Sequence, residues 1–119
     1  PRTEHGSSLS ACMYALVACR FGAAEEAYPF FLKSARADWD GGGKQWAGLV
    51  YIGGTHPAAS GGAWKVFAQG FAGLEAENGQ LTIRPQLPEK WNAIRFRCRL
   101  GDQVYQITAN HKKGVIETL

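Results

Sequence analysis

The sequence predicts an α+β fold in which helices come first and an antiparallel sheet follows. Apolar residues recur at helical spacing in three segments before residue 74. After residue 74 they alternate with polar residues in short runs that are separated by turns. At 119 residues the chain is long enough for one domain at most. Helices followed by strands are typical of an α+β domain or of the boundary between two domains.

Three helices are expected in the first part of the chain. Their expected ranges are residues 8–22, 23–38 and 60–73. Ser7 or Ser8 is a suitable N-cap for the first helix, and Gly22 occupies the position that a glycine prefers at a helix C-terminus. Pro29 falls inside the second helix, where it should kink the helix or shift its start. Because the connection between these two helices is very short, they should be antiparallel neighbours.

Residues 41–58 show no helical period and contain too many apolar side chains for disorder, so a functional loop is expected there. Strands are then expected on either side of a turn at residues 77–80 and over residues 93–100, 103–109 and 114–118. Arg95, Arg97 and Arg99 alternate with apolar residues, which predicts a strand with one solvated face. Nucleic-acid binding is the less favoured alternative, because no nucleic-acid module accompanies these arginines.

Charge and cysteine content restrict the class of protein. The net charge is only +3. Cys12 and Cys19 lie on one predicted helix with their Cα atoms roughly 10 Å apart, too far for a disulfide. No cysteine or histidine spacing suggests a metal site, so we expect none. Because the cysteine usage fits a reducing compartment and no apolar run could span a membrane, we expect a cytoplasmic protein with no membrane or nucleic-acid partner.

Two short stretches stand out as candidate binding elements. His5 precedes a run of glycine and serine that includes Ser7 and Ser8, and His56 follows Gly-Gly-Thr. Each stretch opens an apolar helix, and a helix N-terminus offers free N–H groups that favour phosphate. The alternative for the first stretch is an ordinary capping motif with a surface histidine. The alternative for His56 is a loop histidine that is satisfied by a carbonyl, although the surrounding glycines favour a site.

The acidic residues do not complete an active site. Glu4, Asp38 and Asp40 are the acids near the two stretches, none has an obvious partner, and Asp38 and Asp40 fit the end of a helix better. No nucleophile elbow, phosphate-binding loop or dinucleotide fingerprint is present. Taken alone, the chain therefore predicts an anion site without the acid that glycosyl transfer requires.

Several segments, in this order, resemble glycoside hydrolase family 65, which contains maltose, trehalose, kojibiose and nigerose phosphorylases and a few related hydrolases. The segments are RTEHGSSLS at 2–10, SARAD at 34–38, GTH at 54–56, ASGGAW at 59–64, QGFAGL at 69–74 and LPEKW at 87–91. Together they cover nearly the whole chain. One departure is Pro57, since many members have an aliphatic residue after this histidine.

The resemblance implies a fold that agrees with the prediction of helices followed by strands. The family has an (α/α)6 barrel between an N-terminal β-sandwich and a C-terminal β-sheet domain. Residues 1–73 would be the last helices of the barrel, and residues 74–119 would lead into and form part of the C-terminal β domain. The chain would then be the C-terminal portion of a larger enzyme, inactive without the upstream part, and the family often forms homodimers.

The resemblance also implies an activity, namely inverting phosphorolysis of an α-glucosidic disaccharide to β-glucose 1-phosphate. Carried over, the phosphate contacts would be Ser7, Ser8 and His56, with His5 lining the site. The general acid, a glutamate, would lie upstream, so no catalytic residue is expected in this chain. Inorganic phosphate would be a co-substrate, and no cofactor is expected.

Two alternatives to a phosphorylase remain. An inverting hydrolase on the same fold would need a carboxylate base where phosphate would otherwise lie. A non-catalytic carbohydrate-binding or structural module would need nothing upstream. For a sugar pocket, Trp46 is the favoured aromatic, whereas core packing is the favoured role of Trp64.

Overall fold

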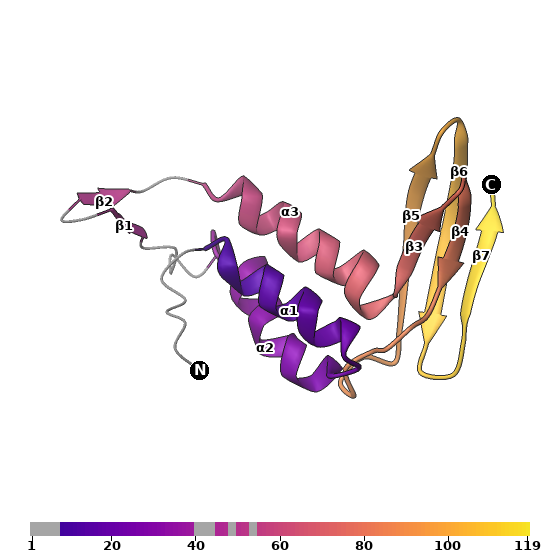
Figure 1. Ribbon diagram of the computed structural model, residues 1–119, viewed down its shortest axis with the longest axis horizontal. Coiled ribbons are helices and arrows are strands. Elements are labelled where there is room, and N and C mark those ends of the chain that lie inside the picture. The colour runs from indigo at the N-terminus through magenta and orange to yellow at the C-terminus, as the bar shows by residue number, and fades with distance from the viewer. Residues whose placement is uncertain (1–7, 40–44, 48–49, 53–54) are drawn as a thin grey trace.

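The computed structural model describes residues 8–39, 45–47, 50–52 and 55–119, and of residues 45–47 and 50–52 it describes the backbone alone. A group of helices lies at one side of an antiparallel sheet (Figure 1), as the sequence predicts. The helices are α1 (Ser10–Arg20), α2 (Ala24–Ala35), α3 (Pro57–Lys65) and the π-helix η1 (Val66–Phe71). The strands are β1 (Gln45–Ala47), β2 (Val50–Ile52), β3 (Leu74–Glu77), β4 (Gln80–Ile83), β5 (Ala93–Leu100), β6 (Gln103–Asn110) and β7 (Gly114–Thr118).

The boundaries of the first two helices differ in part from the predicted ones. The residue that caps α1 is Leu9, with no side-chain hydrogen bond, so the prediction of Ser8 as the N-cap is wrong; Ser7 lies outside the described residues. The second helix ends at Ala35 and continues through Pro29, which removes one intrahelical hydrogen bond without ending the helix. Gly22 has a φ of +77°, as expected of a glycine that follows a helix.

The third helix starts earlier than predicted and changes its hydrogen bonding along its length. It begins at Pro57, and after Lys65 it continues as η1. The N–H of Ala72 donates to the carbonyl of Phe67, five residues back, at 3.1 Å. Hydrophobic periodicity alone does not distinguish this geometry from an α-helix, because both bury one side of a continuous helical segment.

The face of α1 that packs against its neighbours carries small residues. Ala11, Cys12, Ala15 and Cys19 are almost completely buried. Of the larger apolar side chains that recur at helical spacing in α1, Leu9, Met13 and Val17 are exposed, and Leu16 is buried. Small side chains on the buried face allow α1 to approach α3 and η1 closely, so packing distance rather than side-chain size decides which face is covered.

Glycines on the opposite helices complete this close contact. A Cβ at Gly62 would lie 2.3 Å from Sγ of Cys12, and a Cβ at Gly70 would lie 3.0 Å from Sγ of Cys19. Real Cβ atoms do not approach other atoms as closely as the first of these distances. The crossing of α1 with α3 therefore requires glycine at residue 62.

We expect Gly62→Ala to destabilise the protein by about 1–3 kcal/mol, because overpacking forces α1 and α3 apart. The matched control is Gly61→Ala, where a Cβ would meet nothing within 4 Å. Alanine in an exposed helix interior is more favourable than glycine by up to about 1 kcal/mol, so this control should not destabilise. Denaturant melts of the two variants measure the difference, and equal stabilities would contradict the close crossing.

The sheet confirms the strand predictions and their alternation. Strands β5, β6 and β7 form an antiparallel sheet in that order, and β3 pairs with β4 in a separate hairpin. Ile94 and Phe96 of β5 are buried, whereas Arg95, Arg97 and Arg99 are exposed, so this strand has one solvated face as expected. The helices and the sheet share one hydrophobic core, whose aromatic members are Tyr28, Phe30, Phe31, Phe67, Phe71, Trp91, Phe96 and Tyr105.

The step from the helices to the sheet is fixed by backbone contacts. Gly73 has a φ of +61°, and its carbonyl accepts the N–H of Arg84 at 3.0 Å. The N–H of Gln86 donates to the carbonyl of Phe71 at 2.8 Å, and its side-chain amide donates to the carbonyls of Cys19 and Gly70. Gln86 therefore ties the end of α1, η1 and the segment after β4 together.

The described cysteines are free thiols, in agreement with the sequence prediction. Burial raises the pKa of the Cys19 thiol from 9.0 to about 11. Since the folded state favours the neutral thiol, this group stabilises the fold below pH 9, and that contribution is lost as the pH rises from about 9 to 11.

We therefore expect Cys19 to resist alkylation by iodoacetamide at pH 8 in the native protein and to react once the protein is unfolded, because the thiolate is the nucleophile. Mass spectrometry of the peptide that contains Cys19 measures the modification. Rapid labelling of native protein would show that the thiol is not held in this buried site.

None of the helices in the described parts of the chain combines the length and the apolar composition that a membrane span requires.

Candidate functional site

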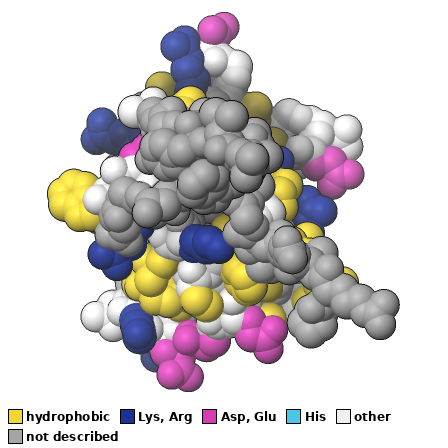
Figure 2. Space-filling model, turned by 90° about the vertical axis from the view of Figure 1, so that its left-hand side faces the viewer, with side chains coloured by type: hydrophobic (Ala, Val, Ile, Leu, Met, Phe, Trp, Pro, Cys, Tyr) yellow, Lys and Arg dark blue, Asp and Glu magenta, His cyan; other side chains and the backbone are white. Residues whose placement is uncertain are grey.

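Three helix ends meet at one end of the molecule. The N-terminus of α1, the C-terminus of α2 and the N-terminus of α3 lie side by side at the end away from the sheet (Figure 1). Ser8 lies in the turn before α1, Asp38 in the turn after α2, and His56 immediately before α3. Figure 2 views the molecule from this side and shows that hydrophobic side chains and charged side chains of both signs lie on this face.

Asp38 and His56 form the central contact of this end. The backbone N–H of His56 donates to both carboxylate oxygens of Asp38, at 2.8 and 2.9 Å. The ring atom Nδ1 of His56 lies 2.6 Å from Oδ1 of the same carboxylate. The side chain of His56 is 15% exposed and that of Asp38 is 36% exposed. One carboxylate therefore holds both the backbone and the ring of His56.

The ionised carboxylate of Asp38 determines which ring nitrogen of His56 carries the proton of their contact. Hydrogen bonds from the backbone and the side chain of His56 hold the pKa of Asp38 below its usual 3.8. An ionised carboxylate can only accept hydrogen bonds, so the proton of the contact is on Nδ1 of His56. The other ring nitrogen, Nε2, is the atom of the imidazole that does not contact Asp38.

The pH dependence of this contact follows from the direction of the shift. Because the pKa of Asp38 is lower in the folded protein, its contribution to stability is present above about pH 3.8. That contribution is lost as the pH falls through the folded pKa. At neutral pH the carboxylate is fully ionised and the contact is intact.

The partner of Asp38 is distant in the sequence. Asp38 lies in the turn after α2, as expected, and it has a partner, His56, that is not obvious from the sequence. The two residues are separated by 18 positions, and no local pattern links them. The signal that could have found the pair is topological: consecutive antiparallel helices return a residue after α2 to the start of α3.

The other predicted site residues are only partly described. Ser8 is half-buried in the turn before α1, and His5 and Ser7 lie outside the described residues. Trp46 lies in β1, opposite Tyr51 of β2, in a short hairpin where the sequence predicted only a loop; its side chain lies outside the described atoms. The structure therefore brings Ser8 and His56 to the same end of the helices.

Pro57 is compatible with the start of α3. It occupies the first helical turn, where a proline lacks only an N–H that would have no intrahelical partner. The N–H groups of Ala59 and Ser60 donate to the carbonyl of His56, at 3.0 and 3.1 Å. The departure from an aliphatic residue at this position therefore leaves the backbone geometry around His56 intact.

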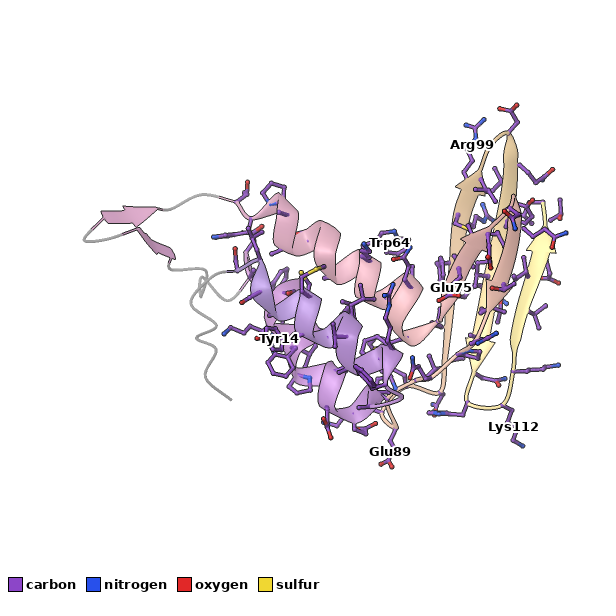
Figure 3. All side chains as sticks on the ribbon, viewed as in Figure 1. Tyr14, Trp64, Glu75, Glu89, Arg99 and Lys112 are labelled. Atoms are coloured by element: carbon purple, nitrogen blue, oxygen red, sulfur yellow. The ribbon has the colours of Figure 1, made fainter. Side chains whose placement is uncertain are left out.

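Trp64 is not the core residue that the sequence favoured. Trp64 is 52% exposed and lies on the helix that leads toward the sheet (Figure 3). Its ring stacks on Phe67 and lies edge-to-face with Phe96, with centroid distances of 5.5 and 5.4 Å. It borders an apolar hollow of about 320 Å³ between α2 and α3 that Phe31 and Ala63 also line. Trp64 therefore makes aromatic contacts at the border of the core while about half of it stays exposed.

Within the described residues, no group of three or more histidine, cysteine, aspartate or glutamate side chains gathers in a way that could hold a metal ion.

Two family models match the chain. The model of the glycosyl hydrolase family 65 central catalytic domain matches residues 1–65, and the model of the C-terminal domain of the same family matches residues 74–119. Residues 66–73, between the two matches, contain η1 and the step from the helices to the sheet.

Named relatives match along nearly the whole chain. A nigerose phosphorylase of Lachnoclostridium phytofermentans is 54% identical over 119 residues, which are 100% of this chain and 16% of the relative. A 1,2-alpha-glucosylglycerol phosphorylase of Bacillus selenitireducens is 36% identical over 116 residues, and a kojibiose phosphorylase of Escherichia coli is 32% identical over 118 residues. The chain covers 98% and 99% of its own length in these two matches and 15% of each relative.

A solved structure has the same fold. A chain described as a kojibiose phosphorylase from the human microbiome superposes with a TM-score of 0.78 at 24% identity, over 100% of this chain and 15% of that structure. Together with the two family models, which match residues on both sides of the helix-to-sheet junction, these findings show that the chain belongs to glycosyl hydrolase family 65.

Proposed function

We propose that this chain is part of an inverting α-glucoside phosphorylase, which converts an α-linked glucose disaccharide and phosphate into β-glucose 1-phosphate and the released sugar. The observation that carries the proposal is the 54% identity, over the full chain, to a protein named as a nigerose phosphorylase. The other relatives reported above are also named as phosphorylases. Nigerose is therefore the first substrate to test, and kojibiose is the second.

Residues 1–73 would be the last helices of an (α/α)6 barrel, and residues 74–119 would be part of the C-terminal β domain. The ranges that the two family models match support this division. The exposed side of α1 supports it as well, since Met13, Val17 and Phe21 are 46%, 53% and 85% exposed. Such a row of apolar side chains fits a surface against which further helices pack.

The chain would supply part of the phosphate site. His56 and Ser8 lie at the end where three helix termini meet, and Ser7 and His5 come directly before Ser8 in the sequence. Ser8 Oγ and Nε2 of His56 are the groups that we assign to phosphate oxygens. The N–H of His56 is already bound to Asp38, so the imidazole, rather than this N–H, is the group of His56 that would hold phosphate.

The reaction needs one bond to form and one to break. A phosphate oxygen attacks the anomeric carbon as the bond from that carbon to the bridging oxygen breaks, which inverts the configuration. A carboxylic acid elsewhere in the enzyme gives its proton to the leaving oxygen. Because phosphate is itself an anionic nucleophile, no carboxylate base is needed. The chain's own residues would orient phosphate for in-line attack.

The hydrolase alternative is less well supported by the geometry. An inverting hydrolase needs a carboxylate that takes a proton from water. Both oxygens of Asp38 accept hydrogen bonds from His56, and its pKa is lowered, so it is a poor base at neutral pH. Asp38 is therefore better suited to hold His56 than to activate water.

The test is the product distribution of the full-length enzyme that carries this chain. It is incubated with nigerose or kojibiose, with and without inorganic phosphate, while sugar phosphate and free glucose are followed. We expect β-glucose 1-phosphate to form only when phosphate is present. Equal release of glucose without phosphate would identify a hydrolase, and sugar binding without any turnover would identify a non-catalytic module.

A further inference from the structure

We propose that Asp38 is the positioning residue of the phosphate site: its carboxylate holds the backbone and Nδ1 of His56 and so presents Nε2 to a phosphate oxygen. The inference rests on the proposed function and goes beyond it, because it assigns a role to a residue that would not itself contact phosphate. It starts from three contacts with the carboxylate of Asp38: two from the backbone N–H of His56 and one from its ring.

The first argument is geometric. The imidazole of a histidine can rotate about χ1 and χ2. Here the carboxylate of Asp38 binds both the backbone N–H and the ring of His56, which restricts that rotation. The carboxylate therefore fixes the ring relative to the start of α3. Since Nδ1 and Nε2 lie on opposite sides of the ring, holding Nδ1 also sets the direction of Nε2.

The position of Asp38 is itself fixed by its backbone. The turn after α2 is closed by the N–H of Ala37, which donates to the carbonyl of Ser34 at 3.3 Å, and by the N–H of Trp39, which donates to the carbonyl of Arg36 at 3.0 Å. Ala37 is buried, and Ser34 is almost completely buried. The carboxylate thus comes from an anchored turn, so it can hold His56 in place.

The second argument concerns the proton on the ring. With Nδ1–H committed to an ionised carboxylate, Nε2 either carries a second proton or presents a lone pair. In the first case it donates to a phosphate oxygen with a full positive charge between two anions, which strengthens the hydrogen bond. In the second case it accepts the P–OH proton. In both cases one proton lies between Nε2 and phosphate. The contact with Asp38 excludes the tautomer that lacks a proton on Nδ1.

The decisive variant is Asp38→Asn in the full-length enzyme, with nigerose and phosphate as substrates. Asparagine has the same size and keeps one oxygen for the N–H of His56, but it replaces the second oxygen with an N–H donor and removes the charge. We expect the KM for phosphate to rise about 10- to 100-fold, the range seen when outer partners of a binding histidine are removed. The KM for nigerose should change by less than about twofold, because the sugar is not bound through Asp38.

The matched control is Asp102→Asn. Asp102 lies in the exposed turn between β5 and β6, where its carboxylate lies 3.7 Å from the guanidinium of Arg99 and both side chains are largely solvated. It makes the same chemical change far from the helix ends, so neither KM should move. A rise of both KM values in Asp38→Asn, by equal factors, would indicate a general structural defect and would overturn the inference.

A double-mutant cycle with His56→Asn keeps the test decisive even if Asp38→Asn lowers stability. If Asp38 acts through His56, Asp38→Asn should have no further effect on the KM for phosphate in the His56→Asn background. The same increase in both backgrounds would overturn the inference. The wild-type reaction separates the two hypotheses: hydrolysis without phosphate would overturn the proposed function and this inference with it, whereas phosphorolysis with an unchanged KM in Asp38→Asn would overturn this inference alone.

Discussion

His56→Asn is expected to raise the KM for phosphate about 10- to 100-fold, the loss expected when one hydrogen bond to a charged ligand is removed. The amide nitrogen of asparagine takes the place of Nδ1, so the contact with Asp38 and the start of α3 can persist. The atom that is lost is Nε2, which we assign to phosphate. The effect is measured from initial rates at varied phosphate and saturating nigerose.

The matched variant is His56→Gln, which can place an amide N–H where Nε2 lies in the wild type. We expect it to recover part of the phosphate affinity that His56→Asn loses. Although the side chain of His56 is only 15% exposed, it is not a large side chain of the hydrophobic core. The melting temperatures of both variants should therefore stay near that of the wild type. An unchanged KM for phosphate in His56→Asn would show that the imidazole does not hold phosphate.

Gly73→Ala is the substitution with the largest expected effect on stability. A Cβ at this position would lie 2.0 Å from the carbonyl oxygen of Arg84, and the backbone has a φ of +61°. A side chain in the left-handed region costs roughly 1–2 kcal/mol, and a clash with backbone that cannot move adds about 1–3 kcal/mol. We therefore expect a loss of about 2–5 kcal/mol, measured by denaturant unfolding, or failure of the protein to accumulate.

Gly101→Ala separates the two causes. Gly101 also has a φ of +61°, but a Cβ there would meet nothing within 4 Å. This variant should show only the backbone cost of roughly 1–2 kcal/mol. If Gly73→Ala were no more destabilising than Gly101→Ala, the close contact between Gly73 and the carbonyl of Arg84 would be wrong.

The strands were predictable because their signals are local. The alternation around Arg95 and Arg97 fixed the solvated face of β5, and the turn residues at 77–80 separate β3 from β4. A period of two and a turn signal are properties of neighbouring residues, so they can be read from one sequence. The same holds for Gly22, whose position after a helix predicted its positive φ.

Other features depend on contacts that the sequence does not display. The buried side of α1 carries mostly small residues, and a Cβ at Gly62 would clash with Cys12 on that side. The β1–β2 hairpin is too short to give a periodic pattern. The pair of Asp38 and His56 joins two turns through the packing of α2 and α3, so spacing along the chain gives no sign of it.

The most direct test of the account is a crystal structure of the full-length enzyme with bound phosphate. The account predicts a phosphate oxygen within about 2.7–3.2 Å of Nε2 of His56, with Nδ1 still bound to Asp38 and Oγ of Ser8 on a second oxygen. Phosphate bound elsewhere, or Nε2 of His56 turned to a protein carbonyl while phosphate is present, would contradict it.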